Sequence, residues 1–144
     1  MFGRKAVDIR WSDMDPNFHL RHSVYYDLCA NSRINFLNDH GFTPDVLIEK
    51  QVGPILFREE CIFKREIRFT DHIEIDLQLQ KCKRDGSRWT MMHQIWKNHT
   101  ILSAVITIDG AWIDIRKRKL TLPPDGVVTA FTEIAKSEDF TWID

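Results

Sequence analysis

The stretch SVYYDLCANSRINFLNDHG, residues 23–41, decides the fold that this sequence predicts. Ser23 suits the N-cap of a helix, and Gly41 follows where helices commonly end in a left-handed residue. Between them the apolar residues recur at the spacing of one helix face. We therefore expect one long helix of about four turns, whose apolar stripe comprises Val24, Tyr25, Leu28, Cys29, Phe36 and Leu37.

The pattern of apolar residues changes its period after this helix. Beyond Pro54 apolar and charged residues alternate, which is typical of strands with one buried face. The Asp85-Gly86 pair is a strong hairpin signal, and Asn98-His99 marks a second reversal. The predicted strands cover residues 57–69, 73–80, 89–97 and 101–115, and Pro123-Pro124 ends the sheet before a short helix over 127–136.

A short strand is also expected before the long helix, from Ala6 to Trp11, and a polar loop then covers residues 12–22. The order of strand, long helix and four antiparallel strands predicts an α+β fold, with the helix packed on one face of a curved sheet. No repeat or linker divides the chain, so we expect one domain over residues 1–144. The open edges of such a sheet predict a homodimer or homotetramer.

Composition excludes several classes of protein. Twenty basic and twenty-one acidic residues give a net charge of -1, so no domain-wide positive field is available for nucleic acid. The first ten residues lack the apolar segment of a signal peptide, and no apolar run approaches the ~20 residues that span a bilayer. Three widely spaced cysteines fit neither a disulfide framework nor a zinc site. We expect a soluble cytoplasmic protein with reduced thiols.

The predicted loop carries a spaced set of polar residues. The segment WSDMDPNFHLRHSVY, residues 11–25, resembles the active-site loop of the 4-hydroxybenzoyl-CoA thioesterase family, which joins the first strand to the central helix of the hot-dog fold. The family loop carries Asp-x-Asp, a residue seven beyond the second Asp and a Tyr three further. These positions are Asp13, Asp15, His22 and Tyr25. The branch of the family that acts on short acyl-CoAs and acyl carrier protein thioesters also has His at the seventh position.

This resemblance implies an acyl-CoA thioesterase of the hot-dog fold without a metal or other cofactor. Asp15 would act as general base or as nucleophile, and these two routes stay open. A backbone N–H near His22, at the positive end of the helix, would polarise the thioester carbonyl. The His22 side chain would position water or protonate the leaving thiolate. The substrate would be a small or medium acyl-CoA or an acyl carrier protein thioester.

Further residues are expected around the substrate. Asp13 is predicted to be structural, bonding N–H groups of the loop. The resemblance places CoA phosphates at basic residues flanking the Asp85-Gly86 turn, although solvated charges at a sheet edge explain those residues equally well. Glu59 shares a strand face with Phe57, and is either exposed, with Arg65 as partner, or a polar group of the pocket. The candidate substrate-binding residues are Trp11, Asn17, Tyr25, Glu59, Arg84, Ser87 and Arg88.

Two alternative functions remain open at this stage. The loop differs from the family pattern because Pro16-Asn17-Phe18 stand where glycine is common and Trp11 stands where the His-bearing branch has Tyr. A non-catalytic hot-dog protein that binds acyl thioesters, or serves as a scaffold, is therefore one alternative. The other is an enoyl-CoA hydratase, since residues 13–19 also resemble the D-x-N-P-x-H loop of hot-dog hydratases with the His one residue too far along.

Overall fold

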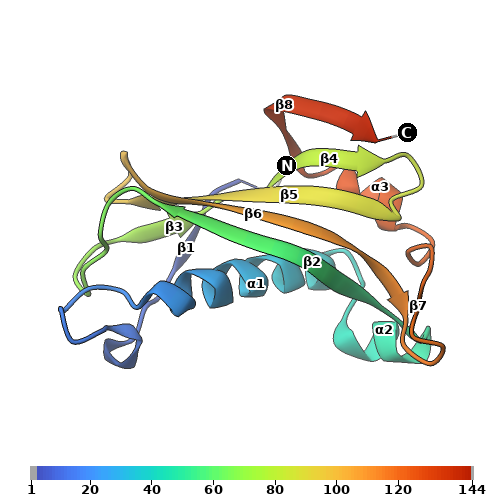
Figure 1. Cartoon of the computed structure of the whole chain (residues 1–144), viewed down its shortest axis with the longest axis horizontal. Helices are drawn as coiled ribbons and strands as arrows, with labels where there is room; N and C mark the ends of the chain where they lie inside the picture. Colours follow the sequence, from blue (N-terminus) through green and yellow to red (C-terminus); the bar gives the residue numbers. More distant parts are fainter. Residues whose placement is uncertain (1–2, 144) are drawn as a thin grey trace.

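A central helix lies along one face of a curved sheet in the computed structural model, which describes residues 3–143 (Figure 1). The helix is α1 (His22–Asp39), and a 3-10 turn, η1 (Trp11–Asp13), precedes it. Two short helices, α2 (Pro44–Glu49) and α3 (Val127–Phe131), lie near the far end of α1. The strands are β1 (Lys5–Val7), β2 (Val52–Phe63), β3 (Ile73–Ile75), β4 (Gln78–Lys83), β5 (Arg88–Lys97), β6 (Ile101–Asp114), β7 (Lys119–Leu120) and β8 (Ala135–Ile143).

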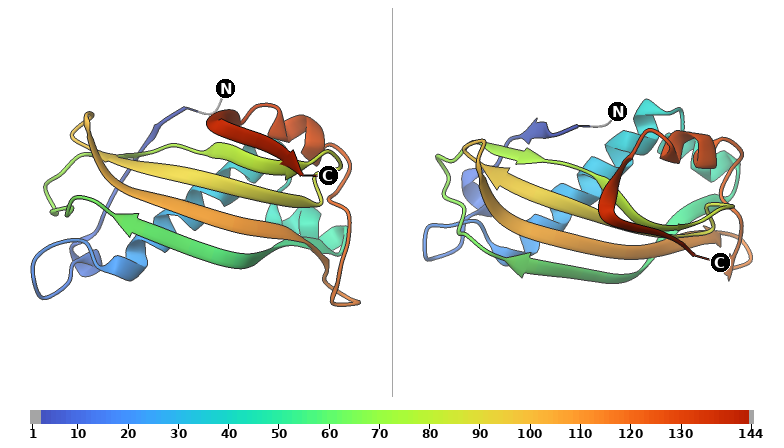
Figure 2. Two further views of the ribbon diagram at one scale, coloured as in Figure 1. Left: turned by 45° about the horizontal axis from the view of Figure 1, so that its top comes forward. Right: turned by 90° about the horizontal axis from the view of Figure 1, so that it is seen from above.

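The sheet is built around the antiparallel strands β2, β6 and β5, in that order. On the far side of β5, β3 and β4 follow one another along the same edge. β1 extends β3 in antiparallel fashion, whereas β8 runs parallel to β4. Among the strands of residues 3–143, β2 pairs with β6 alone, so it forms one edge of the sheet (Figure 2).

The core lies between α1 and the concave face of the sheet. The helix contributes Cys29 and Phe36, and the sheet contributes Ile75, Ile95 and Ile106, all of them at most 1% exposed. The three cysteines are free thiols, as expected. None of the helices formed by residues 3–143 is long and apolar enough to cross a membrane. A long helix wrapped by a curved antiparallel sheet is the hot-dog arrangement, which confirms the fold expected from the sequence.

The start of the long helix differs from the prediction in one detail. The helix begins at His22 with Arg21 at the N-cap, where no side chain caps the backbone, so the prediction of Ser23 as N-cap was wrong. Gly41 does end the helix region in a left-handed conformation, with φ of 86°. Pro44 begins α2, an element that was not predicted, and Thr43 caps it through a hydrogen bond from the Val46 N–H.

The strands also depart from their predicted limits. The first strand ends at Val7, and Trp11 belongs to η1 instead. The strand predicted over residues 73–80 breaks at Asp76, whose side-chain Oδ1 accepts the N–H of Gln94 at 2.6 Å and so interrupts the ladder. The C-terminal helix is shorter than predicted because the chain continues into β8.

Candidate functional site

A tight turn precedes α1 and carries Asp15. Met14 and Leu20 form an isolated antiparallel bridge, and the N–H of Asp15 donates to the carbonyl of His19 at 2.9 Å. Phe18 lies in the turn with φ of 66°, a left-handed conformation that a bulky residue rarely adopts and glycine adopts readily. A glycine would adopt this conformation without strain, whereas Phe18 adopts it here with a bulky side chain.

The carboxylate of Asp15 is oriented by its own turn. Its Oδ1 accepts the backbone N–H groups of Asn17 at 2.8 Å and of His19 at 3.4 Å. Its Oδ2 lies 3.1 Å from Nδ1 of the His19 ring. The side chain keeps 21% of its surface exposed. The group is therefore fixed in direction and still reachable by a small molecule.

A cleft of about 440 Å³ opens beside this carboxylate. Its walls come from the Asp15 turn, from the first turn of α1 and from the end of β2 with the segment that follows. Apolar and charged groups both face it, so it suits a ligand with a polar reacting centre and an apolar portion. The residues lining it are Asp15, His19, Leu20, His22, Tyr25, Phe63, Lys64, Arg65 and Glu66.

The beginning of α1 supplies N–H groups next to the cleft. The amides of His22 and Ser23 belong to the first helical turn, where no intrahelical acceptor is available. The helix dipole also places partial positive charge at this end. His22 lines the cleft itself. A carbonyl oxygen bound near this turn would meet donors suited to a developing negative charge.

The histidine that contacts Asp15 is His19, which the spacing argument did not single out. The turn folds His19 back onto the carboxylate four residues earlier, while no hydrogen bond or ion pair links the His22 side chain to Asp15 among the described residues. His19 also lies 3.9 Å from Glu66. The sequence signal that was available is the short Asp-Pro-Asn turn, which brings residues at its two ends together.

Asp13 has the structural role predicted for it. It is buried, and its Oδ2 accepts the N–H of Arg10 at 2.9 Å while Oδ1 accepts the Arg10 guanidinium at 3.1 Å. These hydrogen bonds hold the pKa of Asp13 below its usual value. Its backbone carbonyl accepts the N–H of Arg21 at 2.8 Å, which ties η1 to the start of α1. Asp13 thus braces the loop that carries Asp15.

Tyr25 forms the floor of the cleft. Its ring is buried and meets Phe63 edge-on, with 4.9 Å between the ring centroids. Burial raises the pKa of Tyr25 to about 12, so its hydroxyl stays protonated near neutral pH. Tyr25 therefore joins α1 to the end of β2 and leaves a neutral phenol beside the Asp15 cleft.

The other two predicted residues of the loop lie nearer the surface. Trp11 is 62% exposed and packs edge-on against Phe69 at 5.8 Å, with Phe18 on its other side at 6.4 Å. It does not line the Asp15 cleft. Asn17 is exposed, and its backbone N–H, as described above, is a donor to Asp15. Asn17 orients the carboxylate, and Trp11 belongs to an exposed aromatic cluster.

Glu59 lies with a different arginine from the one suggested by the sequence. Its carboxylate is 3.8 Å from the guanidinium of Arg33, which comes from the buried side of α1, and 32% of its side chain is exposed. The Arg33 guanidinium also lies 3.0 Å from Nε2 of His93 on β5. The other nitrogen of that ring is 2.8 Å from the carbonyl oxygen of Asp76. Arg65 lines the Asp15 cleft instead.

Burial sets the charge of His93, which forms an interior group with Arg33 and Glu59. His93 is 0% exposed, and loss of solvation, helped by the nearby Arg33 charge, lowers its pKa to about 3. The imidazole is therefore neutral at physiological pH. Desolvation also lowers the pKa of Arg33. A mainly apolar cavity of about 200 Å³ adjoins Arg33 and is lined further by Trp89, whose buried indole N–H has no acceptor.

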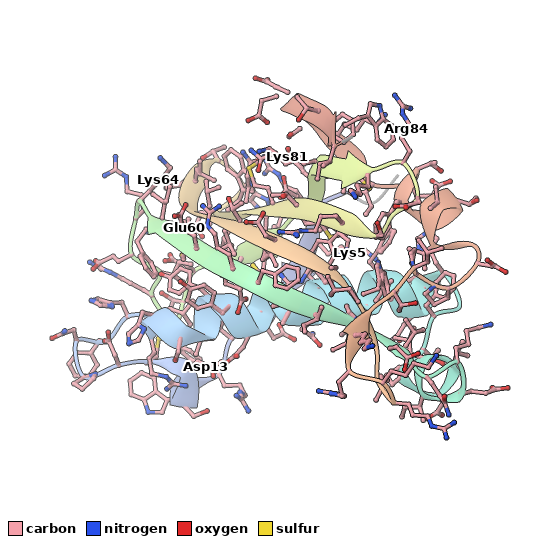
Figure 3. The ribbon with its side chains drawn as sticks, turned by 45° about the vertical axis from the view of Figure 1, so that its right-hand side comes forward. Lys5, Asp13, Glu60, Lys64, Lys81 and Arg84 are labelled. Atoms are coloured by element: carbon pink, nitrogen blue, oxygen red, sulfur yellow. The ribbon has the colours of Figure 1, made fainter. Side chains whose placement is uncertain are left out.

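The predicted CoA-phosphate residues lie at the other end of the molecule from Asp15. Figure 3 shows Arg84 at the upper right and Asp13 at the lower left. Gly86 has φ of 74°, and Ser87 bonds Asp85 at 2.6 Å, so the hairpin turn itself is confirmed. Arg84 stacks on Trp142 at 4.3 Å, and Arg88 stacks on Phe57 at 4.5 Å. Within one chain these residues do not join the Asp15 cleft.

Comparison with known proteins identifies the family. Residues 9–131 match the model of the thioesterase-like superfamily, and a comparison with curated proteins found no match. Three solved structures are similar in fold. A hypothetical protein from Staphylococcus aureus in complex with CoA has TM-score 0.86 and 14% identity, covering 100% of this chain and 90% of that one.

The other two structures are described as thioesterases. A 1,4-dihydroxy-2-naphthoyl-CoA thioesterase from Synechocystis has TM-score 0.81 and 14% identity, covering 92% of this chain and 97% of that one. A gentisyl-coenzyme A thioesterase has TM-score 0.75 and 22% identity, covering 86% and 98% respectively. The TM-scores establish a common fold. With the match over residues 9–131, the chain belongs to the thioesterase-like superfamily.

Proposed function

We propose that this protein hydrolyses an acyl-CoA thioester to a free acid and CoA, with Asp15 as the central carboxylate. The observation that supports this proposal most is the position of Asp15. Its carboxylate is held by two backbone N–H groups and His19, and it borders the cleft at the first turn of α1. A general base or nucleophile and a set of free amides then face the same space, which is what attack on a thioester requires.

Hydrolysis of the thioester follows one of two routes. In the first, Asp15 takes a proton from water while the water oxygen bonds the thioester carbon. The carbon–sulfur bond then breaks, CoA thiolate leaves, and the proton on Asp15 passes to the thiolate or to solvent. In the second, the carboxylate oxygen bonds that carbon, CoA thiolate leaves, and water then cleaves the resulting anhydride. Both routes place negative charge on the carbonyl oxygen, where a first-turn amide near His22 contributes ~3 kcal/mol as a preorganised donor. Both routes end with CoA thiolate, which takes up a proton from solvent or a nearby acid.

We propose that two copies associate along β2. In the described part of the chain this strand pairs with β6 alone. It presents four large apolar side chains, Leu56, Phe57, Ile62 and Phe63, each at least 40% exposed. An unpaired edge of this length invites a second strand. A two-fold axis on β2 would bring the Arg84, Ser87 and Arg88 turn of one copy to the Asp15 end of the other. The basic turn could then hold CoA phosphates in the dimer.

The decisive experiment measures thiol release from a panel of acyl-CoAs by wild type and by Asp15→Asn. We expect release by wild type and its loss in the variant. A folded wild type that releases no thiol from any substrate would overturn the proposal and favour the binding alternative, which rests on the absence of glycine from residues 16–18 and on Trp11 in place of Tyr. Hydration of crotonyl-CoA without thiol release would instead favour a hydratase. Label in Asp15 after a single turnover in ¹⁸O water would establish the nucleophilic route, because water that attacks the Asp15 carbonyl of the anhydride leaves its oxygen in that carboxylate.

A further inference from the structure

Three potential metal ligands gather where β3 begins and β5 turns into β6. Nδ1 of His99 lies 3.3 Å from Oε1 of Glu74, and Nε2 of His72 lies 3.9 Å from Oε2 of the same carboxylate. The two imidazole rings are 4.6 Å apart. One ligand atom from each of the three residues lies within 4.8 Å of the other two. The two histidines thus approach different oxygens of one carboxylate.

The backbone segments that carry these side chains are tied together. The N–H of Asn98 donates to the carbonyl of His72 at 2.8 Å, and the N–H of His72 donates back to Oδ1 of Asn98 at 3.0 Å. The side-chain amide of Asn98 also donates to Asp71 at 3.0 Å. Glu74 lies in register with Trp96 in the β3–β5 ladder. The positions of the ligand residues are therefore set by the sheet and by the turn.

The geometry points to a site for a divalent transition metal, and we propose that His72, Glu74 and His99 bind zinc. Imidazole and carboxylate groups are common zinc ligands at 2.0–2.2 Å, and tetrahedral bonds of that length separate ligand atoms by about 3.3 Å. The distance between His99 and Glu74 already has this value. The half-exposed His72 side chain has the freedom to close the remaining gap. Three protein ligands leave a fourth position open to water.

Arg4 is the charged neighbour that opposes this site. Its guanidinium stacks on Trp96 at 4.0 Å, donates to the carbonyl of His99 at 2.8 Å and lies 4.0 Å from Glu74. A fixed positive charge near a cation weakens binding, although exposure to solvent screens much of the effect. Arg4→Gln is therefore expected to tighten zinc binding severalfold. Removal of a ligand residue is expected to have the opposite effect and to weaken zinc binding.

The test uses the full chain without a polyhistidine tag, freed of metal by a chelator. Cobalt is titrated while its visible absorption is followed, and zinc binding is measured by calorimetry. We expect one equivalent to bind. His99→Asn and Glu74→Gln should each weaken binding by about tenfold or more, since even residues behind metal ligands contribute this much. Asparagine suits the left-handed backbone at position 99, where φ is 70°, so the turn is retained.

Two control variants complete the test. His40→Gln removes a histidine beyond the other end of α1 and should leave binding unchanged, as should Asp15→Asn, whose effect belongs to the proposed hydrolysis. Failure of wild type to bind cobalt or zinc, or equal binding by His99→Asn and Glu74→Gln, would overturn the proposal.

Discussion

The Asp15 cleft and the interior group of Arg33, Glu59 and His93 place the same kinds of side chain in different surroundings. At the first site a carboxylate 21% exposed lies 3.1 Å from a histidine that is itself partly exposed. At the second, a guanidinium 11% exposed lies 3.0 Å from a histidine with no exposure at all. Both sites depend on α1, the first at its N-terminal turn and the second on its buried face.

The difference in exposure indicates a different role for each group of charged side chains. The guanidinium of Arg33 lies 3.0 Å from Nε2 of His93 and 3.8 Å from the Glu59 carboxylate, so its removal would take one partner from each of these two groups. Asp15 is oriented by its own turn and keeps exposed surface toward the cleft. We infer that the interior group contributes to stability and the Asp15 cleft to activity.

The sharpest contrast is expected from Asp15→Asn. Asparagine keeps an oxygen that can accept the N–H groups of Asn17 and His19, so the free energy of unfolding should change by less than about 1 kcal/mol. The rate of thiol release should fall by about a thousandfold, because an amide is neither a base nor a nucleophile. Urea unfolding and thiol release on the same preparation check both. A large loss of stability would mean that Asp15, like the interior group, contributes mainly to the stability of the fold.

The reverse pattern is expected from Arg33→Met. Removal of one partner from a buried charged group commonly costs about 3 kcal/mol, since the other partners stay buried without compensation. Urea unfolding should show this loss, while the folded fraction keeps most of its thiol release. Arg116→Met, at an exposed arginine, is the matched control and should change little. Unchanged stability together with lost activity would instead assign Arg33 and its cavity to the substrate.

The buried histidine predicts a pH dependence of stability. Unfolded His93 takes up a proton near pH 6.5, whereas folded His93 stays neutral down to about pH 3. The unfolded state then binds more protons below about pH 6.5, so stability falls as pH falls, with a slope approaching 1.4 kcal/mol per pH unit at about 25 °C. Burial raises the pKa of Asp76, which gives an opposite slope at the acid end.

The measurement of that slope is therefore confined to about pH 5 to about pH 7. Urea unfolding across this range should give a shallower slope for His93→Gln than for wild type. Glutamine is neutral in both states and has no proton to take up. An equal slope in the two proteins would mean that His93 is accessible to protons in the folded state.

Several elements were predictable because their signals are local. The apolar stripe of α1, the left-handed Gly41 and the Asp85-Gly86 hairpin all follow from residues close together in sequence. Strand β8 was not predicted, because its segment AKSEDFTWI lacks strict alternation and its parallel partner β4 lies more than fifty residues earlier. The pairing of Arg33 with Glu59 likewise depends on how α1 crosses β2.

The candidate site likewise combines residues that the sequence predicted with a contact that depends on the folded backbone. The resemblance to the family loop predicted that Asp15, His22 and Tyr25 gather at one site, and all three line the cleft. It did not identify His19 as the neighbour of Asp15, because that contact depends on the left-handed Phe18 that reverses the chain. The spacing of motif residues along the sequence indicates which residues lie near a site. The backbone angles between them determine which side chains touch.

The smallest expected effects are those on kcat of substitutions at His19 and His22, the two histidines that line the cleft. His19→Gln should lower kcat by about tenfold, because the 3.1 Å contact that orients Oδ2 of Asp15 is weakened. His22→Gln should lower it only severalfold, since the amide proposed as oxyanion donor belongs to the backbone and survives the change. Steady-state kinetics with the best acyl-CoA from the panel measures both, and KM should change less than kcat for His19→Gln. A larger loss in His22→Gln would return the chief supporting role to His22, as the family spacing implies, and would leave the contact between His19 and Asp15 as a feature of the turn alone.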